Sequence, residues 1–187
     1  MTKRTADPGW SEVIRTLPLL VIPVIGMRRM AANSSSLISM RMVWLVSVNA
    51  LLFLWLPVIL VGNQIDSSGS TAGAFVVVAA VGAFAQLLAP RFAPEPSFDT
   101  NETFSRSFQR ATFVRIAFAE LAAFAGLFGF VVSGAALIYG VGFVIAGAGL
   151  YEAAPRIGRI AALQTHADDT GVDIDVVASL HGDRLAR

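Results

Sequence analysis

The sequence contains no cysteine. This absence excludes disulfide bonds, thiol nucleophiles, iron–sulfur clusters and cysteine-based zinc sites. Lysine is also nearly absent, because Lys3 is the only lysine among 14 basic residues. The excess of arginine over lysine, together with abundant alanine and glycine, is typical of a GC-rich bacterial genome. We therefore expect a bacterial source.

Charge is scarce along the whole chain. Only 14% of the 187 residues are charged and 55% are hydrophobic, whereas about a quarter of the residues of a soluble domain are charged. This leaves too few charged side chains to cover a soluble protein of this size. The net charge of +1 gives no reason to expect a nucleic-acid partner. The composition predicts an integral membrane protein.

Four long apolar stretches each approach the roughly 20 residues that a helix needs to cross a bilayer. They cover residues 42–61, 72–89, 111–132 and 135–154. Each is hydrophobic nearly all round, as expected for helices surrounded by lipid or by other helices. The connections at 63–71 and 133–134 are short, so the sequence predicts an all-α protein whose four transmembrane helices form two αα-hairpins.

The basic residues all lie on one side of this arrangement. Neither short turn contains Lys or Arg, so the positive-inside rule places both termini in the cytoplasm of a bacterial plasma membrane. Arginines that flank the spans are expected to contact lipid headgroups. These are Arg28, Arg29, Arg41, Arg91, Arg106, Arg110, Arg156 and Arg159.

The spans divide the chain into an N-terminal segment (1–41), a membrane domain (42–154) and a C-terminal segment (155–187). Asp7 followed by Pro8 resembles a helix N-cap with proline at the first helical position. We interpret residues 8–27 as an interfacial helix that leads into a proline-bent, shallowly inserted stretch; a fifth span is the alternative.

Two further helices are expected at the membrane surface. Asp99 and Glu102 resemble a capping box, which would begin a helix that continues to Val132. After the fourth span, apolar spacing predicts a cytoplasmic helix to about His166, ended at Gly171. The remaining tail forms one short helix or becomes ordered on a partner.

The sequences at the ends of the second and fourth spans resemble each other. Residues 89–91 and residues 154–156 both read Ala-Pro-Arg, a combination that stops a membrane helix at the headgroups. One interpretation is a duplicated hairpin, and the other is the chance recurrence of a common stop signal.

Glu120 is the only acidic residue deep within a predicted span. It lies roughly 13–15 Å along the helix from Ala111 at the helical rise per residue. A carboxylate at this depth is expected to face the interior of the bundle, where Asn49 or Gln86 on neighbouring helices could reach it. It would serve either as a proton- or ion-binding group or as a structural hydrogen-bonding group.

Small residues gather on the last two spans, where they allow helix backbones to approach closely. Those expected to pack are Ala119, Ala123, Gly126, Gly142, Ala146 and Gly149. Arg115 is expected to extend its head toward the interface, and Glu152 to pair with Arg156. The acidic tail lacks metal-ligand spacing, and no nucleophile–base arrangement is present. We therefore expect no metal, no cofactor and no enzymatic activity.

Two resemblances bear on function. Residues 113–130, together with the tail from Leu163 to Leu180, resemble uncharacterised four-helix bacterial membrane proteins. The two hairpins with a buried Glu resemble, in architecture, the tandem-hairpin proteolipid rotor subunits of membrane ATPases, which implies a homo-oligomeric proton or ion pathway. In those proteins the acid lies on the second helix of a hairpin and the loop faces the cytoplasm, whereas Glu120 is on a first helix and these turns face outward.

The sequence thus favours a non-enzymatic accessory or scaffold subunit that packs in the lipid bilayer against other membrane proteins or against itself. The alternatives are an ion pathway through Glu120 and a membrane protein of phage exclusion or toxin immunity.

Overall fold

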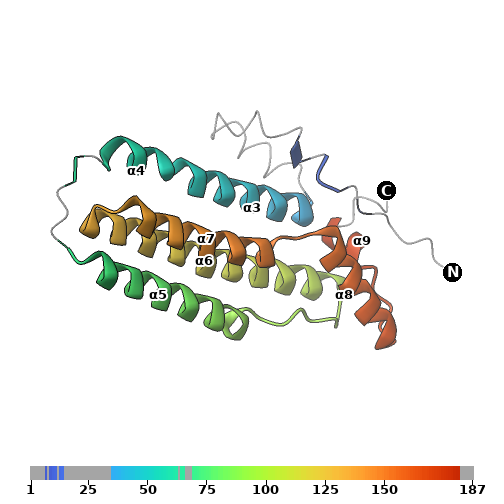
Figure 1. Cartoon of the computed structure of the whole chain (residues 1–187). Helices are drawn as coiled ribbons and strands as arrows, with labels where there is room; N and C mark the ends of the chain where they lie inside the picture. The colour runs from blue at the N-terminus through green and yellow to red at the C-terminus, as the bar shows by residue number, and fades with distance from the viewer. Residues whose placement is uncertain are drawn as a thin grey trace. The chain divides into compact units, whose positions relative to one another are not determined.

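The computed structural model describes residues 7, 9–11, 13–14, 35–62, 64–65 and 69–181. Within these ranges the chain is helical and has no strand, which confirms the all-α class. The helices are α3 (Ser36–Phe53), α4 (Trp55–Val61), α5 (Thr71–Phe92), α6 (Asn101–Ser133), α7 (Ala136–Ala153), α8 (Ile157–Asp169) and α9 (Val176–His181) (Figure 1). Most of the interfacial helix predicted over 8–27 lies outside the described residues, as do Arg28 and Arg29.

Four helical segments of the described chain are long and apolar enough to cross a membrane. They are Ser36–Val61, Thr71–Phe92, Asn101–Ser133 and Ala136–Ala153. The first is interrupted at Leu54, between α3 and α4. Pro57 explains the interruption. Its ring clashes sterically with the carbonyl of the residue four positions earlier, and proline has no backbone N–H to donate to that carbonyl. Four apolar helices are compatible with a multi-pass membrane protein.

The chain forms two compact units. The first comprises residues 1–43, 95–111 and 155–187, and the second comprises residues 44–94 and 112–154. Both α3 and α6 contribute residues to each unit. The segments before the first span and after the fourth therefore belong to one unit, although they are far apart in the sequence.

The first unit has an apolar core made by four helices. Its buried residues are Leu37, Met40, Phe104, Phe108, Ile160, Ile174, Val176 and Leu180. Gln164 of α8 stabilises the turn into α9: its amide nitrogen donates to the carbonyl of Ile174, and its amide oxygen accepts from the backbone N–H of Val176. Gly171 has a φ of 71°, so it adopts the left-handed conformation that ends α8.

In the second unit, α7 contacts every other helix of the unit. Trp44 of α3 donates its indole N–H to the carbonyl of Leu150, and Tyr139 of α7 donates its hydroxyl to the carbonyl of Leu51 at 2.7 Å. The ring of Trp55 in α4 meets Tyr139 edge-on, with centroids 4.9 Å apart. Trp44 and Tyr139 thus bury a large ring while their single polar group is hydrogen-bonded.

Helices α6 and α7 approach each other at two glycines. A Cβ placed on Gly126 would lie 2.9 Å from the Cα of Gly142, and a Cβ placed on Gly142 would lie 2.5 Å from the carbonyl oxygen of Ala122. Only glycine leaves room for backbones this close. Ala119, Ala123 and Ala146 are also buried, and they extend the same small-residue contact.

The cap predicted at the start of α6 is wrong. Helix α6 is capped by Thr100 and Thr103, whose hydroxyls each accept from the other's backbone N–H, rather than by Asp99 and Glu102. Asp99 instead accepts from the Ser97 hydroxyl, and Glu102 pairs with Arg106. Threonine is also a favourable N-cap residue, and Thr100 and Thr103 form the reciprocal pair one residue after Asp99 and Glu102.

The two Ala-Pro-Arg segments also differ. Pro90 lies inside the last turn of α5, which continues to Phe92. Pro155 instead follows the end of α7, and Arg156 is the N-cap residue of α8. The likeness in sequence therefore does not produce the same local structure.

Candidate functional site

Glu120 lies on α6 and is partly buried. In the described part of the chain it makes no hydrogen bond to Asn49 or Gln86. Asn49 is exposed, and its side-chain amide donates to the carbonyl of Leu45 in its own helix. Gln86 donates to the carbonyl of Ile145 on α7 at 3.2 Å. The structure therefore does not bring together the three polar residues that the sequence groups around the carboxylate.

Polar side chains instead meet in a pocket of about 170 Å³ at the end of α5 and α7, where α6 passes beside them. We call it the polar pocket. Its lining residues are Gln86, Ala89, Pro90, Arg115, Gly149 and Glu152. A cation from α6, an acid from α7 and an amide from α5 thus face one small space with apolar walls.

Arg115 supplies the positive charge of the polar pocket. Its Nε is buried and has no hydrogen-bond partner, and the described residues provide no ion pair for its guanidinium. A buried N–H donor without an acceptor is destabilising by about 1–3 kcal/mol. A molecule bound in the pocket that accepts a hydrogen bond from the Arg115 Nε–H would remove this penalty.

The side chain of Gln86 occupies the space that a side chain at position 149 would fill, and this space is open because residue 149 is glycine. A Cβ on Gly149 would lie 2.3 Å from the Gln86 amide nitrogen and 2.8 Å from the Ala119 Cβ. The glutamine side chain therefore lies directly across the α7 backbone. The sequence predicts that Gly149 allows close helix packing. In the structure, Gly149 also leaves room for the Gln86 side chain against the α7 backbone.

Pro90 adds a second polar group from the same helix. Because proline has no backbone N–H, the carbonyl of Gln86, four residues earlier, does not receive the usual i→i−4 hydrogen bond of an α-helix. This carbonyl points along the helix toward Pro90, which also lines the polar pocket. The residues that line the pocket therefore include an arginine whose Nε has no partner, a glutamate, and a glutamine whose backbone carbonyl lacks its usual helical donor.

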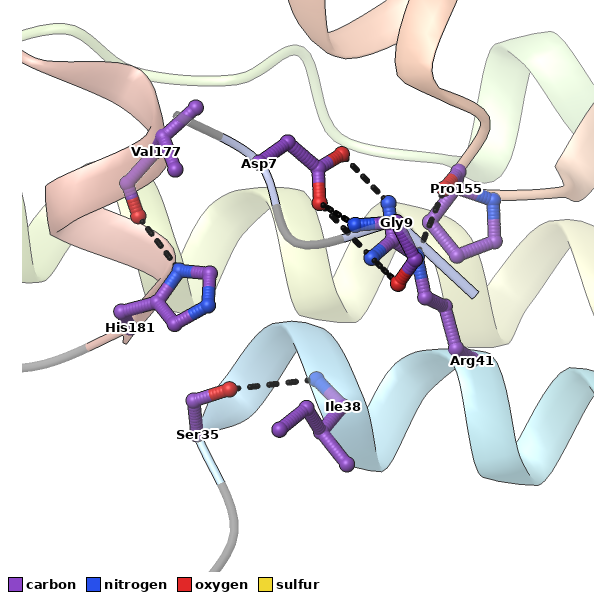
Figure 2. Close-up of polar contacts among 8 residues, drawn as sticks. All are labelled: Asp7, Gly9, Ser35, Ile38, Arg41, Pro155, Val177 and His181. Atoms are coloured by element: carbon purple, nitrogen blue, oxygen red, sulfur yellow. Dashed lines mark hydrogen bonds and ion pairs between the residues drawn. The ribbon is translucent and has the colours of Figure 1, made fainter. Parts of the chain in front are cut away.

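The first unit contains a separate buried ion pair (Figure 2). The guanidinium of Arg41 donates to both carboxylate oxygens of Asp7, at 2.8 and 2.5 Å, and to the carbonyls of Gly9 and Pro155. It also lies over the ring of Trp10, 5.2 Å from the centroid. Its side chain has no exposed surface. The expectation that Arg41 contacts lipid headgroups is therefore wrong, since every polar direction of the guanidinium points into the protein.

The carboxyl of Asp7 responds to two opposing influences. Burial raises its pKa, while hydrogen bonds from Arg41 and from the backbone of Gly9, with the charges of Arg41 and His181, lower it. The net effect lowers the pKa below the usual value of 3.8. Asp7 is therefore ionised at neutral pH, and the pair is charged on both sides.

The other described arginines lie in varied environments. Arg91, Arg106 and Arg110 are exposed, and Arg106 pairs with Glu102 one turn earlier. Arg159 is partly buried, with its guanidinium 5.5 Å from the centre of the Phe108 ring. Arg156 begins α8, and its Nε is buried. Contacts of these arginines with lipid headgroups stay a prediction.

No known protein family, curated protein or solved structure matches this chain. The described residues also contain no group of three histidine or acidic side chains that could hold a metal ion. Function must therefore be argued from the chain's own geometry. The sequence singled out Gln86, Arg115 and Glu152 separately. The signal that joins them is that Gln86 and Glu152 lie near the C-terminal ends of α5 and α7, while Arg115 lies near the start of the third apolar stretch at residue 111.

Proposed function

We propose that the chain is a multi-pass membrane protein, made of two helical hairpins with both termini in the cytoplasm, and that it acts as a non-enzymatic accessory or scaffold subunit. Large apolar side chains on the outside of the second unit support a lipid or protein environment. Examples that are more than 60% exposed are Phe53, Leu60, Val76, Leu87, Phe128 and Leu137. So much exposed apolar surface would be unstable in water.

The observation that carries the scaffold role is an apolar groove between α5 and α6. It encloses about 510 Å³ and is lined by Ser70, Ala74, Val77, Val81, Leu121, Phe124, Ala125, Phe128, Gly129 and Val132. The lining combines small residues, among them Ala74, Ala125 and Gly129, with the large rings of Phe124 and Phe128. Helices associate in membranes by fitting side-chain ridges into such small-residue faces.

The occupant that we propose for this groove is a transmembrane helix of a partner subunit. A helix presents a regular row of side chains that can fill the small-residue floor along its length, and such packing can hold two membrane proteins together without a hydrophobic driving force. The ion pathway gains no comparable support, because the predicted partners of Glu120 make hydrogen bonds elsewhere. No described feature favours phage exclusion or toxin immunity over the scaffold role.

Site-specific photo-crosslinking in native membranes tests this proposal. A photoreactive residue at Val77 or Phe124 should form one defined protein adduct, whereas the same residue at Leu137, which is equally apolar and 71% exposed but outside the groove, should not. Ala125→Leu fills the floor of the groove and should reduce the adduct at least fivefold. An adduct of twice the chain's mass would identify a second copy as the partner.

The result that contradicts the scaffold role is equally clear. Adducts with lipid alone at both groove positions, or protein adducts that form equally at position 137 and persist in Ala125→Leu, would show that the groove does not seat a helix.

A further inference from the structure

The polar pocket is the strongest feature that the scaffold role leaves unused. From its position near the ends of α5 and α7, and from its charges, we propose that it binds a phosphate with a neighbouring primary ammonium, the chemistry of a phosphatidylethanolamine headgroup. This inference rests on the proposed membrane location, but not on the partner helix in the groove.

Arg115 provides the phosphate-binding half. A guanidinium is a planar fork of N–H donors that matches two oxygens of a phosphate. Its Nε is buried without a partner, so a bound phosphate supplies the acceptor that the described chain does not. Binding of a phosphate to an arginine with an unpartnered buried N–H is more favourable than binding to an arginine that already has an acceptor.

Glu152 and Gln86 provide the ammonium-binding half. An ammonium has three N–H donors and no acceptor. The Glu152 carboxylate carries the negative charge, and the Gln86 backbone carbonyl lacks its helical donor because Pro90 has no N–H. Glu152 and Gln86 line the same small space as Arg115. The polar pocket therefore offers a cation and acceptors side by side, which complements a zwitterion.

This pairing predicts selectivity among phospholipids. A phosphatidylglycerol headgroup has a phosphate but no cation. Its phosphate can accept hydrogen bonds from Arg115, but its net negative charge is repelled by the Glu152 carboxylate. The choline group is a cation without an N–H, so it cannot donate a hydrogen bond to the Glu152 carboxylate. Leu87 and Phe92, which are 72% and 62% exposed on α5, offer apolar surface for the lipid chains.

Native mass spectrometry of the purified full chain in detergent tests the assignment, with each phospholipid added to the same micelles. Phosphatidylethanolamine should bind at least fivefold more tightly than phosphatidylglycerol or phosphatidylcholine. Arg115→Gln should reduce its binding at least fivefold. Glu152→Gln, at an exposed position, should reverse the preference toward phosphatidylglycerol.

Arg91→Gln is the matched control for general attraction between arginine and phosphate. Arg91 is exposed, follows Pro90 directly and does not line the pocket, so this variant should weaken all three lipids alike. Equal binding of the three lipids, or identical behaviour of Arg115→Gln and Arg91→Gln, would overturn the proposal. The Glu152→Gln result decides the case even if Arg115→Gln lowers the melting temperature.

Soluble phosphoethanolamine distinguishes a lipid from a free ligand. The lipid should bind at least tenfold more tightly, because its chains contact the apolar face of α5. Equal affinities would show that the pocket takes a water-soluble zwitterion and would overturn the lipid assignment. The crosslinking experiment at the groove uses other residues and another readout, so failure of the scaffold role is seen separately.

Discussion

Gly126 and Gly142 lie back to back where α6 crosses α7, so close that a Cβ on either would meet the Cα of the other at 2.8–2.9 Å. The neighbouring atoms are backbone atoms, which cannot rotate away as a flexible side chain would. We expect Gly142→Ala to lower the free energy of unfolding by about 1–3 kcal/mol, the usual penalty for overpacking a tight contact. Chemical unfolding in detergent micelles measures this change.

Gly147 on the same helix provides the control. A Cβ there would meet nothing within 4 Å, and alanine is a better helix former than glycine by about 1 kcal/mol. Gly147→Ala should therefore leave the unfolding free energy unchanged or raise it. If the two variants unfold alike, the glycine crossing contributes nothing to stability.

The ion pair between Asp7 and Arg41 should make the first unit sensitive to acid. The folded pKa of Asp7 is lowered, so the stabilising effect is complete above the unfolded value of 3.8 and is lost as the pH falls through the folded pKa. Asp7→Asn should lower the free energy of unfolding by about 3–5 kcal/mol at neutral pH, because it leaves a buried guanidinium without its counter-charge. Thermal unfolding at pH 7 and at pH 3 measures both effects.

The exposed pair of Glu102 and Arg106 is the control for this experiment. Both side chains are more than 70% exposed, and ion pairs in water contribute little. Glu102→Gln should therefore unfold as the wild type does at pH 7. A wild-type protein that is as stable at pH 3 as at pH 7 would argue against a stabilising role for Asp7.

The proposed orientation can be checked by labelling, because the chain has no cysteine of its own. Single cysteines at the exposed positions Thr71 and Ala136 should react with an impermeant thiol reagent added to intact cells. Cysteines at Glu95 and Thr165, also exposed, should react only after the membrane is opened. This follows from the absence of Lys and Arg in the two outer turns. Labelling of position 95 in intact cells would contradict the proposed orientation and would place this segment outside the cell.

The helices were predictable from the sequence because a run of about 20 mostly apolar residues has the length of a transmembrane helix, and a helix satisfies the backbone polar groups of the segment within the bilayer. The ends were less predictable: Thr100 and Asp99 are both good N-cap residues, and spacing alone does not choose between them. The burial of Arg41 in an ion pair was not predictable. Its partner Asp7 lies 34 positions away in the sequence, and the pairing depends on tertiary packing. The polar pocket was missed for the same reason, since Gln86, Arg115 and Glu152 come from three helices.

Glu120 provides the last test, because it separates a structural carboxylate from one that must exchange protons. No hydrogen bond to this side chain is present among the described residues, so Glu120→Leu should leave the melting temperature unchanged or raise it by removing a partly buried polar group. Tyr139→Phe is the contrasting control. It removes the hydroxyl bond to Leu51 and should lower the free energy of unfolding by about 0.6–1.7 kcal/mol, the range measured for such bonds in membranes.

Glu120→Gln then decides the functional question, because glutamine keeps the shape of the side chain but cannot ionise. Under the scaffold role, this variant should fold, form the groove adduct and restore the phenotype of a gene deletion as well as the wild type does. A Glu120→Gln protein that folds and crosslinks normally yet fails to complement would favour the ion pathway instead. A loss of stability in Glu120→Leu greater than that in Tyr139→Phe would mean that the carboxyl has a structural partner beyond the described residues.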